Sequence, residues 1–350
     1  MNRLNYLDSL RGIAICGVIL THVGIATQGL PNHISQFSTF GIRGVQLFFI
    51  VSALTLCSVY KENTIDLKSF YTRRFFRIAP MFYICGILYL CLFYFGIMKP
   101  EVSIKFIDVI LTALFLHGFW IHSINNVVPG GWSIASEAMF YLIFPLVLKY
   151  VNDLNRSMAF LAFSFALAVV NLTLGHILSN HFPKQKDLID SYEHFDFLMN
   201  IPSFAMGVFI YHLNKKSSFT WKCPDALFYV VCVMFMALCS DGYSIPFAQL
   251  IAIVFLGFFA WCISNKQYSA FTNKPLSYLG EISFSLYLIH FVVLHTAQIL
   301  LPRLAFPVAN LVALYLSVLV ISVALATLTY RFIEIPMINF GKRLTTKGAH

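Results

Sequence analysis

The sequence predicts an all-α fold: a polytopic membrane helix bundle of about ten transmembrane helices, with the N- and C-termini cytoplasmic. Of the 350 residues, 59% are hydrophobic and only 11% are charged, and the mean hydropathy is +0.76. Soluble domains carry about 25% charged residues, so most of this surface suits lipid better than water. Apolar runs of about 20 residues also recur along the whole chain, as transmembrane helices require.

The candidate helices are apolar segments of nearly the length that a bilayer crossing needs. In chain order they lie at 10–29, 44–60, 79–97, 104–121, 134–150, 158–177, 198–213, 225–240, 246–264, 283–301 and 306–331. No hydrophilic block between them is long enough to fold as a separate soluble domain. We therefore expect one membrane domain at 1–340 and a cytoplasmic tail at 341–350.

The first segment is interpreted as a retained helix. Arg3 and Arg11 would suit the basic region of a cleaved signal peptide, but His22 interrupts the apolar core that such a peptide needs. The many later segments also require a first anchor in the membrane.

The charges of the loops predict the orientation, because Lys and Arg collect in cytoplasmic loops. The basic loops are 61–77, 149–156, 214–222, 265–275 and the C-terminal tail. The loop 179–197 contains acids and histidines and suits the outer face. Because 61–77 and 149–156 both lie inside, one apolar segment between them does not cross. We expect 104–121, which contains Lys105 and Asp108, to re-enter or to lie at the interface.

The net charge of +9 reflects these cytoplasmic loops and does not predict a nucleic-acid partner. The eight cysteines lie mainly inside apolar segments and form no CxxC pair, which favours packing over metal binding or disulfides. The chain has no GxSxG elbow, P-loop or Cys/His zinc spacing. We therefore expect no metal site.

Two ionisable residues interrupt the first apolar segment. Arg11 and His22 are eleven residues apart, so in a helix they share one face at a separation of about 16 Å. Asp8 is placed to pair with Arg11 at i, i+3. Arg11 is either a snorkelling anchor or a functional charge, and His22 is either a structural interhelical residue or a general base.

A second polar cluster lies in PGGWSIASEAMFYLIFP, residues 129–145. We expect a helix that opens at Ser133 as N-cap. Ser133, Glu137 and Tyr141 then line one face of it. An unpaired carboxylate inside a membrane is costly, so Glu137 should meet a partner or a substrate. The alternative is a capped helix with Trp132 in an interfacial aromatic belt.

Two further groups complete the candidates. Arg73, Arg74 and Arg77 precede the third apolar segment, as an ordinary cytoplasmic flank or as a phosphate-binding site. His290 lies in the middle of GEISFSLYLIHF, residues 280–291, as a structural core histidine or as a substrate-binding residue.

These clusters, in this order, resemble the acyltransferase-3 family of integral membrane O-acyltransferases, which includes surface-polysaccharide and O-antigen O-acetyltransferases. The matching pieces are YLDSLRGIAI with Arg-x10-His, GVQLFFIVSA, FYTRRFFRIAP, GGWSIASEAMFYLIFP, ISFSLYLIH and YRFIEIP. They span nearly the whole chain. Two departures are Ala53, where the family usually has glycine, and Ala138, where it often has a second acid.

The resemblance implies a membrane-embedded O-acyltransferase in the bacterial cytoplasmic membrane. Acyl-CoA, most often acetyl-CoA, would be the cytosolic co-substrate, and no cofactor would stay permanently bound. The acceptor would be a hydroxyl of a polysaccharide or lipid-linked glycan at the outer side of the bilayer. By position, Arg11 and His22 match the essential pair of the family. The same reasoning matches Arg74 and Arg77 to its arginine motif, and assigns Trp132, Ser133 and Glu137 to its WSxxxE segment.

These implications lead to a mechanistic hypothesis. Arg73, Arg74 and Arg77 would bind the phosphates of coenzyme A, and its arm would lie beside the first helix. His22 would take the proton of the acceptor hydroxyl as general base or would form an acyl-His intermediate. Glu137 would orient His22 or bind the acceptor, with Trp132, Ser133, Tyr141 and His290 as substrate-binding residues. The rival hypothesis is a non-enzymatic carrier or flippase for a glycolipid or small anion.

Overall fold

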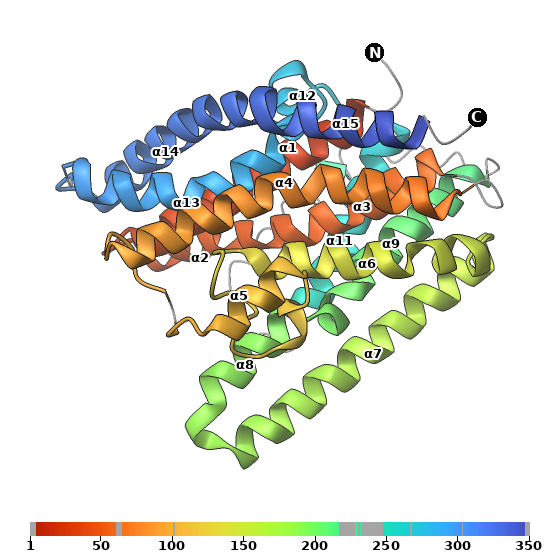
Figure 1. The fold of residues 1–350 in the computed structure, drawn as a ribbon, viewed down its shortest axis with the longest axis horizontal. Helices are drawn as coiled ribbons and strands as arrows, with labels where there is room; N and C mark the ends of the chain where they lie inside the picture. The colour runs from red at the N-terminus through yellow and green to blue at the C-terminus, as the bar shows by residue number, and fades with distance from the viewer. Residues whose placement is uncertain are drawn as a thin grey trace. The chain divides into compact units, whose positions relative to one another are not determined.

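The computed structural model describes residues 5–60, 65–100, 102–216, 228–229, 232, 248–266, 268–302 and 304–346. Every regular element within these ranges is a helix (Figure 1). The chain forms two compact units. Unit 1 takes the described residues of 1–58 and 203–326, and unit 2 takes those of 59–202 and 327–350. Segment 225–240, a predicted helix, lies almost entirely outside the described residues.

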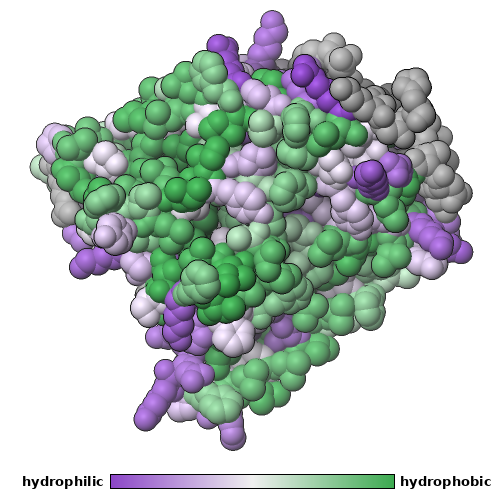
Figure 2. All heavy atoms as spheres, viewed as in Figure 1, coloured by the Kyte–Doolittle hydropathy of each residue, from purple (hydrophilic) through white to green (hydrophobic). Residues whose placement is uncertain are grey.

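Eight helices within the described ranges are long and apolar enough to cross a membrane. They are Asn5–Ala26, Asn32–Val59, Leu67–Tyr94, Gly131–Tyr150, Leu154–His181, Ala248–Asn265, Ser283–Leu300 and Pro307–Thr345. Figure 2 shows apolar side chains over most of the face in view. The predicted fold class, a polytopic membrane helix bundle, is confirmed. The number of crossings and the cytoplasmic position of the termini stay predictions.

Unit 1 is organised around its first helix, α1. Its elements are α1 (Asn5–Ala26), α2 (Asn32–Phe40), η1 (Gly41–Arg43), α3 (Gly44–Val59), most of α9 (Phe197–Lys215), α11 (Ala248–Asn265), α12 (Lys274–Glu281), α13 (Ser283–Leu300) and most of α14 (Pro307–Thr329). The helices α2, α11, α12 and α13 all pack against α1. Because α1 is surrounded in this way, its polar residues meet other helices of the unit.

Two glycines allow α1 and α12 to touch through their backbones. A Cβ at Gly12 would overlap the carbonyl oxygen of Leu276, and a Cβ at Gly280 would overlap that of Asp8. Backbone atoms move less readily than the end of a flexible side chain, so this crossing tolerates only glycine at both positions. The close approach fixes α12 beside the end of α1 that carries Asp8 and Arg11.

Replacing Gly280 with alanine is expected to lower the free energy of unfolding by about 1–3 kcal/mol, because the new methyl group forces the two backbones apart. Thermal unfolding of the detergent-purified protein measures the effect. The matched control is Gly86→Ala in another helix, where the added Cβ lies an ordinary 3.6 Å from Val128. If both variants melted alike, the α1–α12 contact would not be the cause.

Unit 2 contains the helices that carry the arginine cluster and the WSxxxE segment. Its elements are α4 (Leu67–Tyr94), α5 (Phe106–Ala113), η2 (His117–Phe119), α6 (Gly131–Tyr150), α7 (Leu154–His181), η3 (Pro183–Gln185), α8 (Lys186–Phe195), η5 (Tyr330–Glu334) and α15 (Ile335–Thr346). Segment 104–121 forms only the eight-residue α5 and a short 3-10 turn. That is far below the roughly 20 residues of a spanning helix.

The helix α4 begins well before its apolar part. Asp66 caps it by accepting a hydrogen bond from the Ser69 backbone N–H at 3.0 Å, so the arginines that follow are already helical. The helix α15 lies beside this first part of α4 (Figure 1). The rings of Phe76 and Phe340 pack edge to face at 5.2 Å. Helix α15 runs past residue 340 without a break, and the predicted tail at 341–350 therefore begins inside it.

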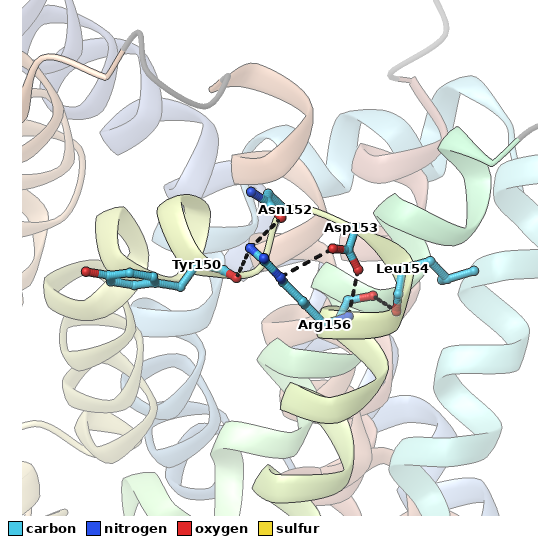
Figure 3. Close-up of polar contacts among 6 residues, drawn as sticks. Tyr150, Asn152, Asp153, Leu154 and Arg156 are labelled. Atoms are coloured by element: carbon cyan, nitrogen blue, oxygen red, sulfur yellow. Dashed lines mark hydrogen bonds and ion pairs between the residues drawn. The ribbon is translucent and has the colours of Figure 1, made fainter.

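A short turn joins α6 to α7, and local hydrogen bonds hold it (Figure 3). Asp153 caps α7 by accepting from the backbone N–H of Arg156 at 2.8 Å. The guanidinium of Arg156 donates to Asn152 Oδ1 at 3.0 Å and pairs with Asp153 Oδ2 at 3.4 Å. Only Val151, Asn152 and Asp153 separate α6 from α7, and these contacts fix the conformation of that turn.

The helices α7 and α8 pack through an acidic side chain. The carboxyl group of Glu193 occupies the space that a side chain at Gly175 would need. Burial, together with the charges of Asp190 and Asp196, raises the pKa of Glu193 to about 7. Burial also raises the pKa of Asp196 to about 6. Both carboxyl groups lie outside the candidate spans, and we expect the packing of α8 against α7 to depend on their protonation.

The stability of unit 2 is expected to fall as the pH rises through about 7. The pKa of Glu193 is 4.5 in the unfolded chain and about 7 in the folded one, so between these values the folded state binds more protons. The stabilisation from this extra protonation is complete below pH 4.5 and is lost as the pH rises to about 7. The melting temperature, followed between those limits, measures this. Glu193→Gln should flatten the profile; an unchanged slope in that variant would contradict the assignment.

Candidate functional site

In unit 1, Arg11 is fixed by two helices. Its Nη1 donates to Asp8 Oδ1 at 2.6 Å within α1, and its Nη2 donates to Thr55 Oγ1 of α3 at 2.6 Å. The Thr55 hydroxyl donates in turn to the carbonyl of Val51. Only 16% of the Arg11 side chain is exposed. A guanidinium held in this way has a defined direction, which a snorkelling anchor does not need.

His22 lies on the same face of α1, eleven residues further along, and its neighbours are aromatic. Its ring centroid is 5.2 Å from that of His290 and 4.4 Å from that of Phe291, both on α13. The ring is half-buried, and neither nitrogen has a hydrogen-bond partner within the described part of the chain. An imidazole with both nitrogens uncommitted can accept a proton from a substrate hydroxyl.

In unit 2, Arg74 lies between two tyrosine rings. Its Cζ is 5.8 Å from the ring centroid of Tyr60 and 5.6 Å from that of Tyr141, which is cation–π distance. Its Nε is buried without a hydrogen-bond partner among the described residues. No ion pair of Arg74 with a carboxylate is found among the described residues. A half-buried guanidinium in that condition is suited to bind an anion.

The other two arginines differ from Arg74. Arg73 is exposed, and its Nε donates to Thr345 Oγ1 of α15 at 3.1 Å. Arg77 is half-buried and lies near enough to Tyr141 to interact with it electrostatically. The cluster therefore presents one exposed and two half-buried cations, an arrangement that suits an anion with several phosphate groups.

The WSxxxE segment begins at a left-handed turn. Gly130 has φ +78, a conformation that favours glycine, and α6 starts directly after it at Gly131. The prediction that Ser133 is the N-cap is wrong, because the N-cap is Gly130, three residues earlier. The Ser133 hydroxyl instead donates to the Gly130 carbonyl at 2.9 Å. Trp132 is buried and stacks on Phe195 at 4.8 Å.

Glu137 is joined to the arginine cluster through Tyr141. The phenol of Tyr141 donates to Glu137 Oε1 at 2.6 Å, one turn away on α6, while its ring lies against Arg74. The structure brings Arg74, Tyr141 and Glu137 together in unit 2. In unit 1 it forms two separate pairs along α1, Asp8 with Arg11 and His22 with His290.

The sequence analysis missed four residues of these sites. Thr55 and Phe291 contact Arg11 and His22, and Tyr60 contacts Arg74. His117 is buried, and its Nε2 donates to the Gly131 carbonyl at 3.0 Å, so it holds the start of α6. Burial lowers the pKa of His117, which favours the neutral ring. The only sequence signal for it was a histidine in an apolar segment, which is too weak to assign a role.

No group of three His, Cys, Asp or Glu residues within the described ranges is arranged to hold a metal ion.

A family model described as an acyltransferase domain matches residues 4–331, which contain every candidate site residue predicted from the sequence. The chain belongs to this acyltransferase family. With its long apolar helices, this member is a multi-pass membrane protein. The resemblance inferred from the motifs is thereby confirmed.

The chain is also similar to curated members named O-acetyltransferase OatA from Staphylococcus aureus strains NCTC 8325 and COL. Each is 25% identical over 363 aligned residues, which cover 95% of this chain and 56% of the relative. The chain therefore spans about half the length of the curated relatives it matches. No solved structure matches it.

Proposed function

We propose that this protein is a membrane-embedded O-acyltransferase that moves an acetyl group from cytosolic acetyl-CoA to a hydroxyl of a surface polysaccharide or glycolipid at the outer side of the bacterial cytoplasmic membrane. Family membership and the name of the OatA relatives support the reaction class. Separate features of the chain support the donor, the acceptor, the general base and the side of the membrane on which each substrate binds.

The observation that carries the proposal is the environment of His22. The ring lies inside a membrane helix, has accessible surface, and is held by aromatic contacts that leave its nitrogens uncommitted among the described residues. A neutral imidazole in this position accepts the proton of an alcohol as the oxygen attacks the thioester carbonyl. The thiolate of coenzyme A leaves, and the imidazolium then returns its proton to that leaving group.

The proposed donor site is the arginine cluster of unit 2. Coenzyme A carries several phosphates, and Arg74 lacks a carboxylate partner among the described residues. Arg73 and Arg77 add exposed and half-buried charges on the same part of α4. The helix flank is basic, which supports a cytosolic position and hence a cytosolic donor.

The proposed acceptor residues lie mainly on α6. Glu137 is half-buried and would accept hydrogen bonds from sugar hydroxyls. Trp132, Ser133 and Tyr141 are buried beside it and would position this carboxylate, Tyr141 through its hydrogen bond to Oε1. The alternative, an acyl-His22 intermediate, uses the same residues and differs in whether acyl enzyme accumulates.

The test uses the full chain reconstituted in lipid nanodiscs with acetyl-CoA and a glycan mixture from the cell envelope. We expect release of free coenzyme A thiol that depends on the glycan, together with a glycan product heavier by one acetyl group. A carrier or flippase would instead bind or move the glycan with no thiol release and no change in its mass. That result would overturn the proposal.

A further inference from the structure

His290 lies next to His22 and is fully buried, with 0% of its surface exposed. Its Nδ1 lies 2.6 Å from the carbonyl oxygen of Tyr287, one turn earlier on α13. A carbonyl oxygen only accepts hydrogen bonds, so Nδ1 holds a proton, and in the neutral ring Nε2 carries the lone pair. The backbone of α13 therefore determines the tautomer of His290.

The Nε2 atom of His290 is buried and has no hydrogen-bond partner within the described residues. A buried acceptor without a partner costs free energy, and such an atom in a native fold requires a physical explanation. The exposed fraction of zero argues against direct contact between this nitrogen and a bulky glycan. The ring of His22 is a polar group beside that of His290, with the ring centroids 5.2 Å apart.

The two imidazoles are held against each other by a third ring. Phe291 packs at 4.4 Å from His22 and 4.1 Å from His290, and the imidazole centroids are 5.2 Å apart with a tilt of 41°. Ring nitrogens lie at the edge of each ring, so this separation lets facing nitrogens approach to about 3 Å, a hydrogen-bond distance. The χ2 torsion of histidine is broad, and a modest rotation of the His22 ring completes the bond.

We propose that His290 is a positioning residue: its Nε2 accepts a hydrogen bond from one ring N–H of His22 and so keeps the lone pair on the other His22 nitrogen. This inference rests on the proposed function, in which that second nitrogen is the general base. The hydrogen bond that one ring nitrogen makes decides which nitrogen of an imidazole is free to accept a proton. His290 would thus act through His22 and not on the substrate, unlike the substrate-binding role predicted from the sequence.

The test combines ¹⁵N NMR of histidine-labelled full-length protein in nanodiscs with steady-state kinetics. His290→Phe keeps an aromatic ring beside Phe291 but removes the acceptor. We expect one dominant His22 tautomer in the wild type and a mixture in this variant. The kcat should fall in proportion to the loss of the reactive tautomer, about twofold for an equal mixture, at unchanged KM for acetyl-CoA, because only the correct tautomer reacts. His290→Gln, whose amide oxygen accepts a hydrogen bond, should recover part of kcat.

The matched control is His295→Phe on the same helix. It lies five residues further on and about 140° around the axis from His290, so the His22 signals should stay unchanged. An unaltered His22 tautomer in His290→Phe would overturn the inference. An altered His22 tautomer with an unaltered kcat in His290→Phe would support the inferred hydrogen bond but refute His22 as the general base. The failure of this inference and the failure of the proposed function are therefore distinguishable.

Discussion

Replacing His22 with alanine is expected to lower kcat for acetyl transfer by about 10²- to 10⁴-fold, the range that a positioned general base contributes. The KM for acetyl-CoA should change little, since no phosphate contact is assigned to this side chain. The assay is glycan-dependent thiol release from protein in nanodiscs. The half-buried ring makes no hydrogen bond within the described part of the chain, so its loss should not unfold α1.

The matched control is His33→Ala, which removes an exposed imidazole near the start of α2 in the same unit. It should keep wild-type kcat and wild-type thermal stability. Protein levels in the membrane are to be compared for both variants. If His22→Ala were folded and retained more than about a tenth of the wild-type kcat, a general-base role would be excluded.

Replacing Arg74 with alanine is expected to raise the KM for acetyl-CoA by about ten- to a hundredfold. A hydrogen bond to a charged group contributes about 1.5–3 kcal/mol, and each 1.4 kcal/mol corresponds to a factor of ten. Tyr60 and Tyr141 would remain in place, but the anion would lose the cation that lies between them. Arg74→Lys keeps the charge without the planar fork and should give an intermediate KM.

Arg156→Ala is the control for loss of an arginine in the same unit. Arg156 is exposed and is already paired with Asp153 in the turn between α6 and α7 (Figure 3). Its removal should leave the KM unchanged and alter stability by less than about 1 kcal/mol. A KM that stayed at the wild-type value in folded Arg74→Ala would contradict a donor role for the cluster.

Hydropathy predicts where this chain suits lipid, and it is less informative about where helices begin. The predicted segments 134–150 and 283–301 agree with α6 and α13 to within three residues, since nearly all of each helix is apolar. By contrast α4 begins at Leu67, well before the predicted start at 79. Its first turns contain three arginines and are stabilised by the Asp66 cap and by α15, a segment distant in sequence.

For the candidate sites too, the sequence predicts some contacts and does not predict others. Contacts within one helix follow from spacing, and the structure contains both Asp8–Arg11 and Glu137–Tyr141. Contacts between helices depend on packing, and no local pattern relates Tyr60 to Arg74 or His290 to His22. The misplaced N-cap has a third cause. A glycine with positive φ opens α6, and sequence spacing alone does not reveal backbone conformation.

The order of the two units along the chain has an evolutionary consequence. Unit 1 is interrupted after residue 58 and resumes at residue 203, and most of unit 2 is the stretch between. The proposed base and its neighbouring histidine are thus encoded outside that stretch, whereas the proposed donor clamp and Glu137 are encoded inside it. Recombination that exchanges residues 59–202 alone would change the proposed binding residues for the acyl donor and the glycan. The descendant would keep His22 and His290, the residues proposed for proton transfer.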